Sequence, residues 1–202
     1  MSRFALGVVL VLALNTAANA SIIYEFTSMS GSGPFTWVYT ASISADQKIN
    51  TVGPSGQPSF GTIFDFPGTV SVTSVALVGT LTATSTLMGT SPHAFNQSSP
   101  DNPAIPNVVT TLSGTFTPAV QTNIFTVTII STVGGPIVFP GEFQEAQAIK
   151  NTPGVPSDNS LTGNTAQIEG PARAAVPEAG TLLLIGTGLV GLAGFARRVR
   201  TN

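Results

Sequence analysis

The stretch FTWVYTASI, Phe35–Ile43, alternates bulky apolar side chains with small or hydroxylated ones. In an extended chain, side chains at alternate positions share one face, so the bulky set lies together. That set is Phe35, Trp37, Tyr39 and Ile43. The stretch therefore predicts a β-strand with one buried, aromatic face.

The same period of two recurs on both sides of this stretch. Each run brings its apolar side chains onto one face of a strand. The runs are Ile22, Tyr24 and Phe26; Phe125, Val127 and Ile129; and, more weakly, Leu112 with Phe116. In residues 69–87 the apolar parity changes, from Val70 and Val72 to Val75 and Leu77, which predicts a bulge or a bend near Thr73 and Ser74.

Clusters of Gly and Pro separate these runs, and no sustained helical period interrupts them apart from a short turn at 142–150. Seven or eight short strands divided by turn signals are typical of an antiparallel β-sandwich or a related barrel. We therefore expect an all-β domain over residues 21–150. Residues 123–132 are β-prone and uncharged, so they would pair with other chains if they formed a sheet edge.

Two segments are predicted to lie outside the strands. Residues 89–107 hold four prolines, too many for a central strand, and long ordered loops of this kind are often functional. Residues 151–175 are rich in Pro, Gly, Ser, Thr and Asn, which predicts a flexible linker of about 25 to 30 Å mean span.

The composition limits the classes of partner. Residues 21–175 hold eight carboxylates against three basic groups, a balance that opposes nucleic-acid binding. Charged residues make up only 8% of the chain, where about 25% is usual. The chain has no cysteine, so the domain must hold together without disulfides.

The first twenty residues predict a secretory signal. Arg3 supplies the positive start, residues 4–14 form an apolar helix, and Ala18 and Ala20 are the small residues at the cleavage positions. An apolar run of this length is too short for a permanent span, which needs about 20 residues. Residues 1–20 are therefore expected to be removed on export, with an uncleaved anchor as the alternative.

The C-terminus predicts a single transmembrane helix. Residues 180–196 carry no charge and extend about 25 Å as a helix, and Arg197, Arg198 and Arg200 follow as a stop on the cytoplasmic side. Residues 186–191 match the dinucleotide pattern G-x-G-x-x-G, but too few residues follow them to complete a βαβ unit. We interpret this match as accidental.

The ordered elements Val176-Pro177-Glu178, the glycine-rich span and the arginine cluster resemble the PEP-CTERM sorting signal of exported bacterial proteins. Ala179 stands where the family has its second proline. The resemblance covers residues 176–202 and implies an exosortase, a membrane protease that removes the tail and passes the body to the cell surface. It also implies a Gram-negative host that makes extracellular polysaccharide. An ordinary anchor that is never cut is the alternative.

Candidate chemical residues are few. His93 is the only histidine, and we expect it to be solvent-exposed in the proline-rich loop. A pair of carboxylates would serve a glycoside hydrolase or bind calcium, but we expect these to be surface charges. The candidates are Asp65, Asp101, Glu142 and Glu145. Trp37, Tyr24 and Tyr39 would suit a sugar-binding surface, although their strand faces favour the core.

The sequence thus favours a non-enzymatic surface or extracellular-matrix protein without metal or cofactor. It would cross the inner membrane, stay as a transient single-span anchor, and then reach the cell surface or the exterior. Its expected partners are an exosortase-like protease, the membrane through the C-terminal helix, and extracellular polysaccharide, with no nucleic acid. A carbohydrate-binding module is the alternative, and a glycoside hydrolase is the third hypothesis.

Overall fold

Strand β2, Phe35–Ile43, has the bounds that its alternation predicts. The computed structural model describes residues 22–53, 56–94, 99–151 and 159–171. Within these ranges the chain forms ten strands, and all their pairings are antiparallel. The others are β1 (Ile22–Ser30), β3 (Gln47–Asn50), β4 (Phe60–Phe64), β5 (Thr69–Ala76), β6 (Leu81–Met88), β7 (Asn107–Phe116), β8 (Thr122–Ser131), β9 (Ile137–Lys150) and β10 (Leu161–Pro171).

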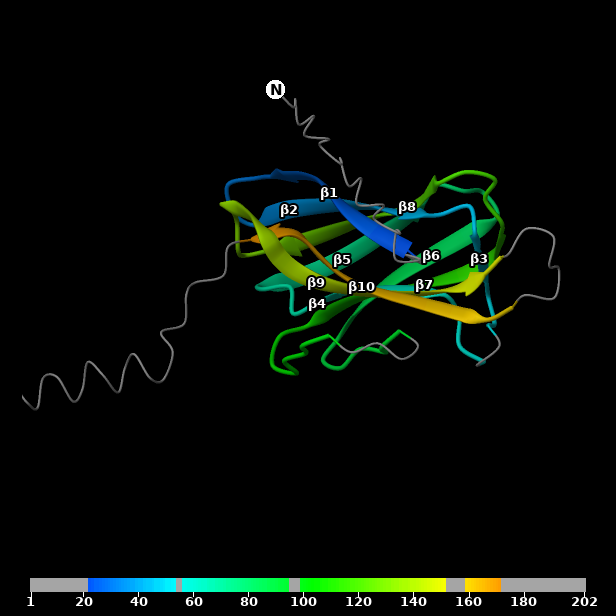
Figure 1. Ribbon diagram of the computed structural model, residues 1–202. Helices are drawn as coiled ribbons and strands as arrows, with labels where there is room; N and C mark the ends of the chain where they lie inside the picture. The colour runs from blue at the N-terminus through cyan, green and yellow to red at the C-terminus, as the bar shows by residue number, and fades with distance from the viewer. Residues whose placement is uncertain (1–21, 54–55, 95–98, 152–158, 172–202) are drawn as a thin grey trace, which may run out of the picture. The chain divides into compact units, whose positions relative to one another are not determined.

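The strands form two sheets that share one core (Figure 1). One sheet has the order β1-β2-β8-β5, and the other has the order β10-β9-β3-β7-β4 with β6 beside β7. Ile22, Trp37 and Val127 of the first sheet belong to the same buried cluster as Ile63, Leu112 and Ile168 of the second. The prediction of an all-β fold of antiparallel strands, a sandwich or a related barrel, is confirmed in the described part of the chain.

Strands β3 and β4 occupy the same position between β7 and β9. Lys48 pairs with Ile149 and Phe60 pairs with Gln147, so β4 continues along β9 where β3 stops. Both strands also pair with β7, and the four sets of pairings close into a small ring. One line of pairing along β7 and β9 is therefore interrupted between Asn50 and Phe60, and the described residues there, 51–53 and 56–59, belong to no strand.

The aromatic side chains predicted for the core are buried. Trp37 and Tyr39 are 0% exposed, and Tyr24 is 2% exposed. Phe66 lies edge-on to Trp37 and Tyr39, with ring centroids 5.7 and 6.0 Å away. Full burial of each such side chain stabilises a fold by about 1.5 to 3 kcal/mol, before the entropy of ordering it. These aromatics are core residues, as their strand faces predict.

Strand β8 occupies the middle of its sheet. Val127 pairs with Tyr39 of β2 on one side and with Ser74 of β5 on the other. The uncharged, β-prone residues 123–131 thus have both edges occupied, which removes the risk of pairing with other chains.

The bulge predicted near Thr73 and Ser74 was wrong. The register shift in β5 lies between Thr69 and Ser71, and residues 77–80 separate β5 from the distinct strand β6. Val75 points to solvent and is 63% exposed. Val75 lies on an edge strand and is not part of the core. The change in apolar parity therefore marks an exposed valine and not a bulge.

The short turn predicted at 142–150 was also wrong, since these residues belong to β9. Residues 144–149 are all buried, so both faces of the strand are covered. A strand covered on both faces has no alternation of apolar and polar residues. The period of two that marks a half-buried strand is therefore missing from these residues.

The predicted linker at 151–175 is wrong for residues 161–171. They form β10, which pairs along β9 from Leu161 opposite Ile149 to Pro171 opposite Ile137. Ile168 is 5% exposed and belongs to the core. The β domain therefore extends at least to residue 171, and residues 152–158 and 172–175 lie outside the described ranges.

Candidate functional site

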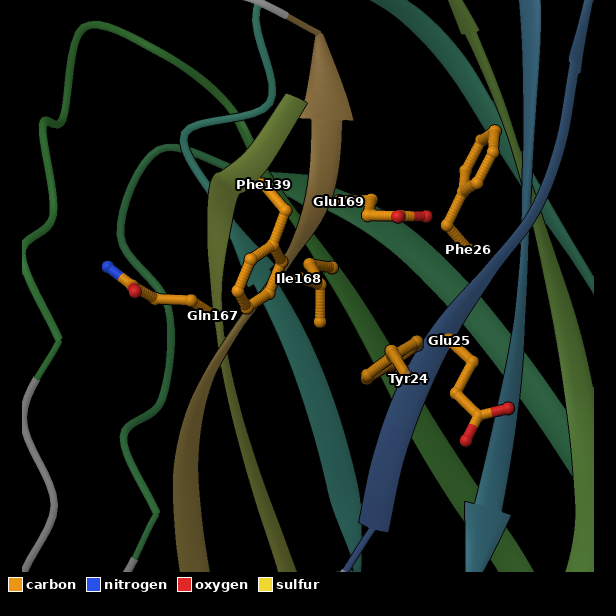
Figure 2. A pocket seen from close by; sticks show the side chains of 7 residues that line it. All are labelled: Tyr24, Glu25, Phe26, Phe139, Gln167, Ile168 and Glu169. Carbon is orange, nitrogen blue, oxygen red and sulfur yellow. The ribbon is translucent and has the colours of Figure 1, made fainter. Parts of the chain in front are cut away.

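A groove of about 270 Å³ opens between β1 and β10, the edge strands of the two sheets (Figure 2). These strands contact each other but share no ladder of hydrogen bonds, so side chains line the space between them. The lining residues are Tyr24, Glu25 and Phe26 of β1, Phe139 of β9, and Gln167, Ile168 and Glu169 of β10.

A bulge between β9 and β10 shapes one wall of the groove. Ile168 pairs with Glu142, and the next pair joins Gly170 to Val138, so residues 139–141 all lie opposite one residue, Glu169. A Cβ atom on Gly141 would lie 2.3 Å from the Gly170 nitrogen, so the two backbones approach too closely for a side chain there. The extra residues carry Phe139 outward.

Phe139 is 68% exposed, an unusual position for a large aromatic side chain. Figure 2 shows its ring beside Ile168, with the Gln167 side chain extending past it. The Glu169 carboxylate extends from β10 towards Phe26, whereas the Glu25 side chain points away from Phe139. The groove thus combines an accessible aromatic ring with an amide and a carboxylate.

A hydrogen bond fixes the backbone of Glu169. Tyr39 Oη of β2 donates to the Glu169 carbonyl oxygen at 2.9 Å. Burial raises the pKa of Tyr39 above its ordinary value, and the carboxylates of Glu142 and Glu169 raise it further. The phenol therefore keeps its proton and remains a donor. The bulged residue is held by the core of the opposite sheet.

The groove can bind a ligand with both apolar faces and hydroxyl or amino groups. An exposed aromatic ring packs against the apolar face of a sugar ring, and amide and carboxylate groups bind its polar substituents. The sequence analysis missed Phe139, Gln167 and Glu169. Two of them lie in the predicted linker, and the third lies at a bulge that no periodic pattern reveals.

His93 is solvent-exposed, as expected, but it also contacts a buried carboxylate that the sequence did not connect with it. Its Nδ1 lies 2.9 Å from Glu145 Oε2, and its side chain is 37% exposed. The imidazole stacks on Phe64, with ring centroids 5.3 Å apart and planes inclined by 18°. The backbone N–H of Ala94 also donates to Glu145 Oε2, at 3.1 Å. His93 thus helps to fasten the loop after β6 to the outer face of the sheet.

Asp65 and Asp101 support the proline-rich loop. The Asp65 carboxylate accepts the Asn102 N–H, at 2.9 Å on Oδ1 and 3.1 Å on Oδ2. Asn107 Nδ2 donates to Asp101 Oδ1 at 3.0 Å, and Asn107 Oδ1 accepts the Asp65 N–H at 2.8 Å. The surface location expected for Asp65 was wrong, since it is 5% exposed. Its buried carboxylate accepts the backbone N–H of an exposed loop residue and so ties the loop to the end of β4.

Glu142 and Glu145 are also buried, at 0% exposure each, so the expected surface location was wrong for them too. They lie three residues apart on β9 and point to opposite faces. Glu145 contacts the loop residue His93, while a Cβ on Gly170 would meet Glu142 Cγ at 2.7 Å. These two carboxylates therefore do not face a common space, as a hydrolase pair must.

Within the described residues, His, Cys, Asp and Glu side chains form no group of three or more that could hold a metal ion. The same described ranges contain no helix whose length and hydrophobicity would allow it to cross a bilayer. The predicted span at 180–196 lies outside them. So do the signal-cleavage residues Ala18 and Ala20, the motif Val176, Pro177 and Glu178, and the stop residues Arg197, Arg198 and Arg200.

Comparison with known families identifies the C-terminus. Residues 175–200 match the PEP-CTERM protein-sorting motif, as the ordered elements there predict. The match identifies the chain as an exosortase substrate, which is exported and sorted to the cell surface through its C-terminus. Neither the curated proteins nor the solved structures include a match to this chain.

Proposed function

We propose that this exosortase substrate works at the cell surface or in the extracellular matrix as a non-enzymatic structural or adhesive protein associated with exopolysaccharide. The sorting motif at 175–200 carries the proposal, because it delivers the β domain to the exterior. The titratable side chains that the sequence singled out support it. His93, Asp65 and Glu145 are each engaged in fastening the loop between β6 and β7.

The proposal is tested in two steps in the producing cell. Mass spectrometry should find mature molecules that lack the residues beyond the sorting motif, and an exosortase deletion should restore those residues. Deleting the gene for this chain should then lower the amount of polysaccharide retained by the cells. Mature molecules that keep residues 180–200 in every fraction would contradict the sorting step, and unchanged retention would contradict the matrix role.

A carbohydrate-binding role is the second candidate, and the exposed ring of Phe139 in the groove favours it. The aromatics from which the sequence suggested this role are buried, so the groove replaces them as the candidate surface. Binding of the full chain to a glycan array, compared with a Phe139→Ala variant, tests it. Loss of binding in the variant supports the groove, and equal binding of both proteins rejects it.

A further inference from the structure

We infer that the groove between β1 and β10 takes glycans that carry protonated amino groups, with Glu169 binding the amine and Phe139 packing against the sugar ring. The inference rests on the carbohydrate-binding role proposed above and names its ligand class. It follows from the charges around the groove and from the directions of its side chains.

The lining of the groove carries two carboxylates, Glu25 and Glu169, and no basic side chain. The described ranges hold two lysines, Lys48 and Lys150, and both lie where β3 pairs with the end of β9. Lys150 forms an ion pair with Asp46. Position 139 is eleven residues from Lys150 along β9, which corresponds to about 35 Å.

That separation is several times the Debye length, which is about 8 to 10 Å at physiological salt. The two lysines therefore do not neutralise the groove carboxylates. A uronic acid or another acidic sugar would meet like charge there and be disfavoured. An ammonium group would meet opposite charge, and a neutral sugar would gain only hydrogen bonds.

The two carboxylates contribute unequally. Glu169 extends across the groove from β10, and its backbone is fixed by the hydrogen bond from Tyr39 Oη (Figure 2). Glu25 is on β1 with its side chain directed away from Phe139, so it acts on a ligand only over a longer distance. We therefore assign the direct contact with the amine to Glu169.

Phe139 supplies the apolar part of the site. Its ring is 68% exposed and stands beside Ile168 at the mouth of the groove. An aromatic ring packs against the apolar face of a pyranose and attracts a nearby cation. A sugar with an amino substituent satisfies the ring and the carboxylate together, and no other common sugar substituent carries the required positive charge.

The test compares three hexasaccharides on the full chain, purified in neutral detergent and studied by calorimetry at low and high salt. The probes are hexamers of glucosamine, of N-acetylglucosamine and of galacturonic acid. The glucosamine hexamer should bind about fivefold or more tightly than its neutral N-acetyl counterpart, which is the value of one close charge pair in water. High salt should reduce this difference, and the acidic hexamer should not bind.

Three variants locate the site. Glu169→Gln should remove the preference for the amine, Glu25→Gln should reduce it less, and Phe139→Ala should weaken both amine and neutral probes. Val75→Ala, an exposed apolar residue on β5, is the matched control and should change nothing. Arg173→Gln removes a cation near the end of β10 in sequence and should not weaken binding of the amine. Thermal melting checks that each variant is folded.

Other outcomes separate the claims. Equal binding of the neutral and amine hexamers, or binding of the acidic one, overturns the assignment of the ligand class while leaving carbohydrate binding in place. Amine preference that survives in both Glu169→Gln and Phe139→Ala places the site elsewhere. If none of the hexamers binds, the ligand assignment is rejected, while processing by exosortase and surface location are decided separately by mass spectrometry.

Discussion

Tyr39 Oη donates a hydrogen bond of 2.9 Å to the backbone carbonyl oxygen of Glu169, although 130 residues separate them in sequence. The bond joins β2 of one sheet to the bulged end of β10 in the other. It therefore connects the buried aromatic core to the wall of the groove and to the last strand before the sorting motif.

Tyr39→Phe tests the stability of this link. The variant keeps the ring in the core and leaves the Glu169 carbonyl without its donor, so we expect a loss of about 1 to 2 kcal/mol in the free energy of unfolding. Thr27→Val, which removes an exposed hydroxyl pair with Thr40, should cost less than about 0.5 kcal/mol. Urea unfolding of the full chain in detergent, followed by fluorescence of the single tryptophan Trp37, measures both. Equal losses would show that the bond to Glu169 is not buried in solution.

Ile168→Ala tests whether β10 belongs to the domain. Ile168 is 5% exposed, so its truncation should lower the free energy of unfolding by about 2 to 4 kcal/mol. The neighbouring exposed residue provides the control, and Gln167→Ala should change stability by about 0.5 kcal/mol or less. The same urea titration reads both values. A flexible linker would give no loss in either variant.

Because His93 and Glu145 contact each other, substitutions at the two positions should change the free energy of unfolding non-additively. His93→Ala leaves a fully buried carboxylate with the Ala94 N–H as its remaining donor among the described residues, so we expect a loss of about 2 to 3 kcal/mol in the free energy of unfolding. Adding Glu145→Gln removes the uncompensated charge and should recover part of that loss. The double-mutant cycle should therefore show coupling of about 1 kcal/mol or more by urea unfolding. Additive losses would mean that the two side chains do not interact.

The ion pair of Asp46 and Lys150 predicts a dependence on pH. Burial raises the pKa of Asp46, but hydrogen bonds from Lys150 and Ser44 outweigh it and hold this pKa below its ordinary value. A carboxyl whose pKa is lowered by folding stabilises the folded state at pH values above its ordinary pKa, which is near 4. This contribution is lost as the pH falls through the lowered pKa. Because the pair is partly exposed, Asp46→Asn should cost only about 0.5 kcal/mol at neutral pH.

The measurement is a comparison of urea midpoints for Asp46→Asn and the parent chain across the acid range. The difference should vanish once the pH is below the lowered pKa of Asp46, where the parent carboxyl is protonated as well. It should also shrink at high salt. A difference that persists at low pH would assign the effect to packing of the side chain.

Ala179→Pro tests the departure from the family's motif. A second proline fixes φ and keeps residue 178 out of a following helix, which should leave Pro177 and Glu178 extended for the protease. We expect a larger fraction of processed chain, measured by mass spectrometry of whole cells. Ala179→Ser is the control without the backbone restraint, and an equal gain in that variant would contradict the conformational explanation.

The alternation in Phe35–Ile43 was enough to predict β2 and its buried face, and the same period found the core residues of β1 and β8. This succeeded because each of these strands has one face in the core, so the period of two is visible in the side chains. The pattern failed at β9, which is covered on both faces, and at β10, whose few large apolar side chains leave too little alternation to detect. It also failed at Val75, because a strand at a sheet edge can leave a valine in solvent.

The all-β class, the aromatic core and the C-terminal sorting motif could be predicted from the amino-acid sequence alone, because they depend on local period, composition and the order of neighbouring elements. The position of the groove and the roles of the charged side chains follow from the folded arrangement. Glu169 meets Tyr39 and Glu145 meets His93 across 130 and 52 residues of chain. Such contacts depend on how the two sheets and the loop pack together, and no local pattern encodes that packing.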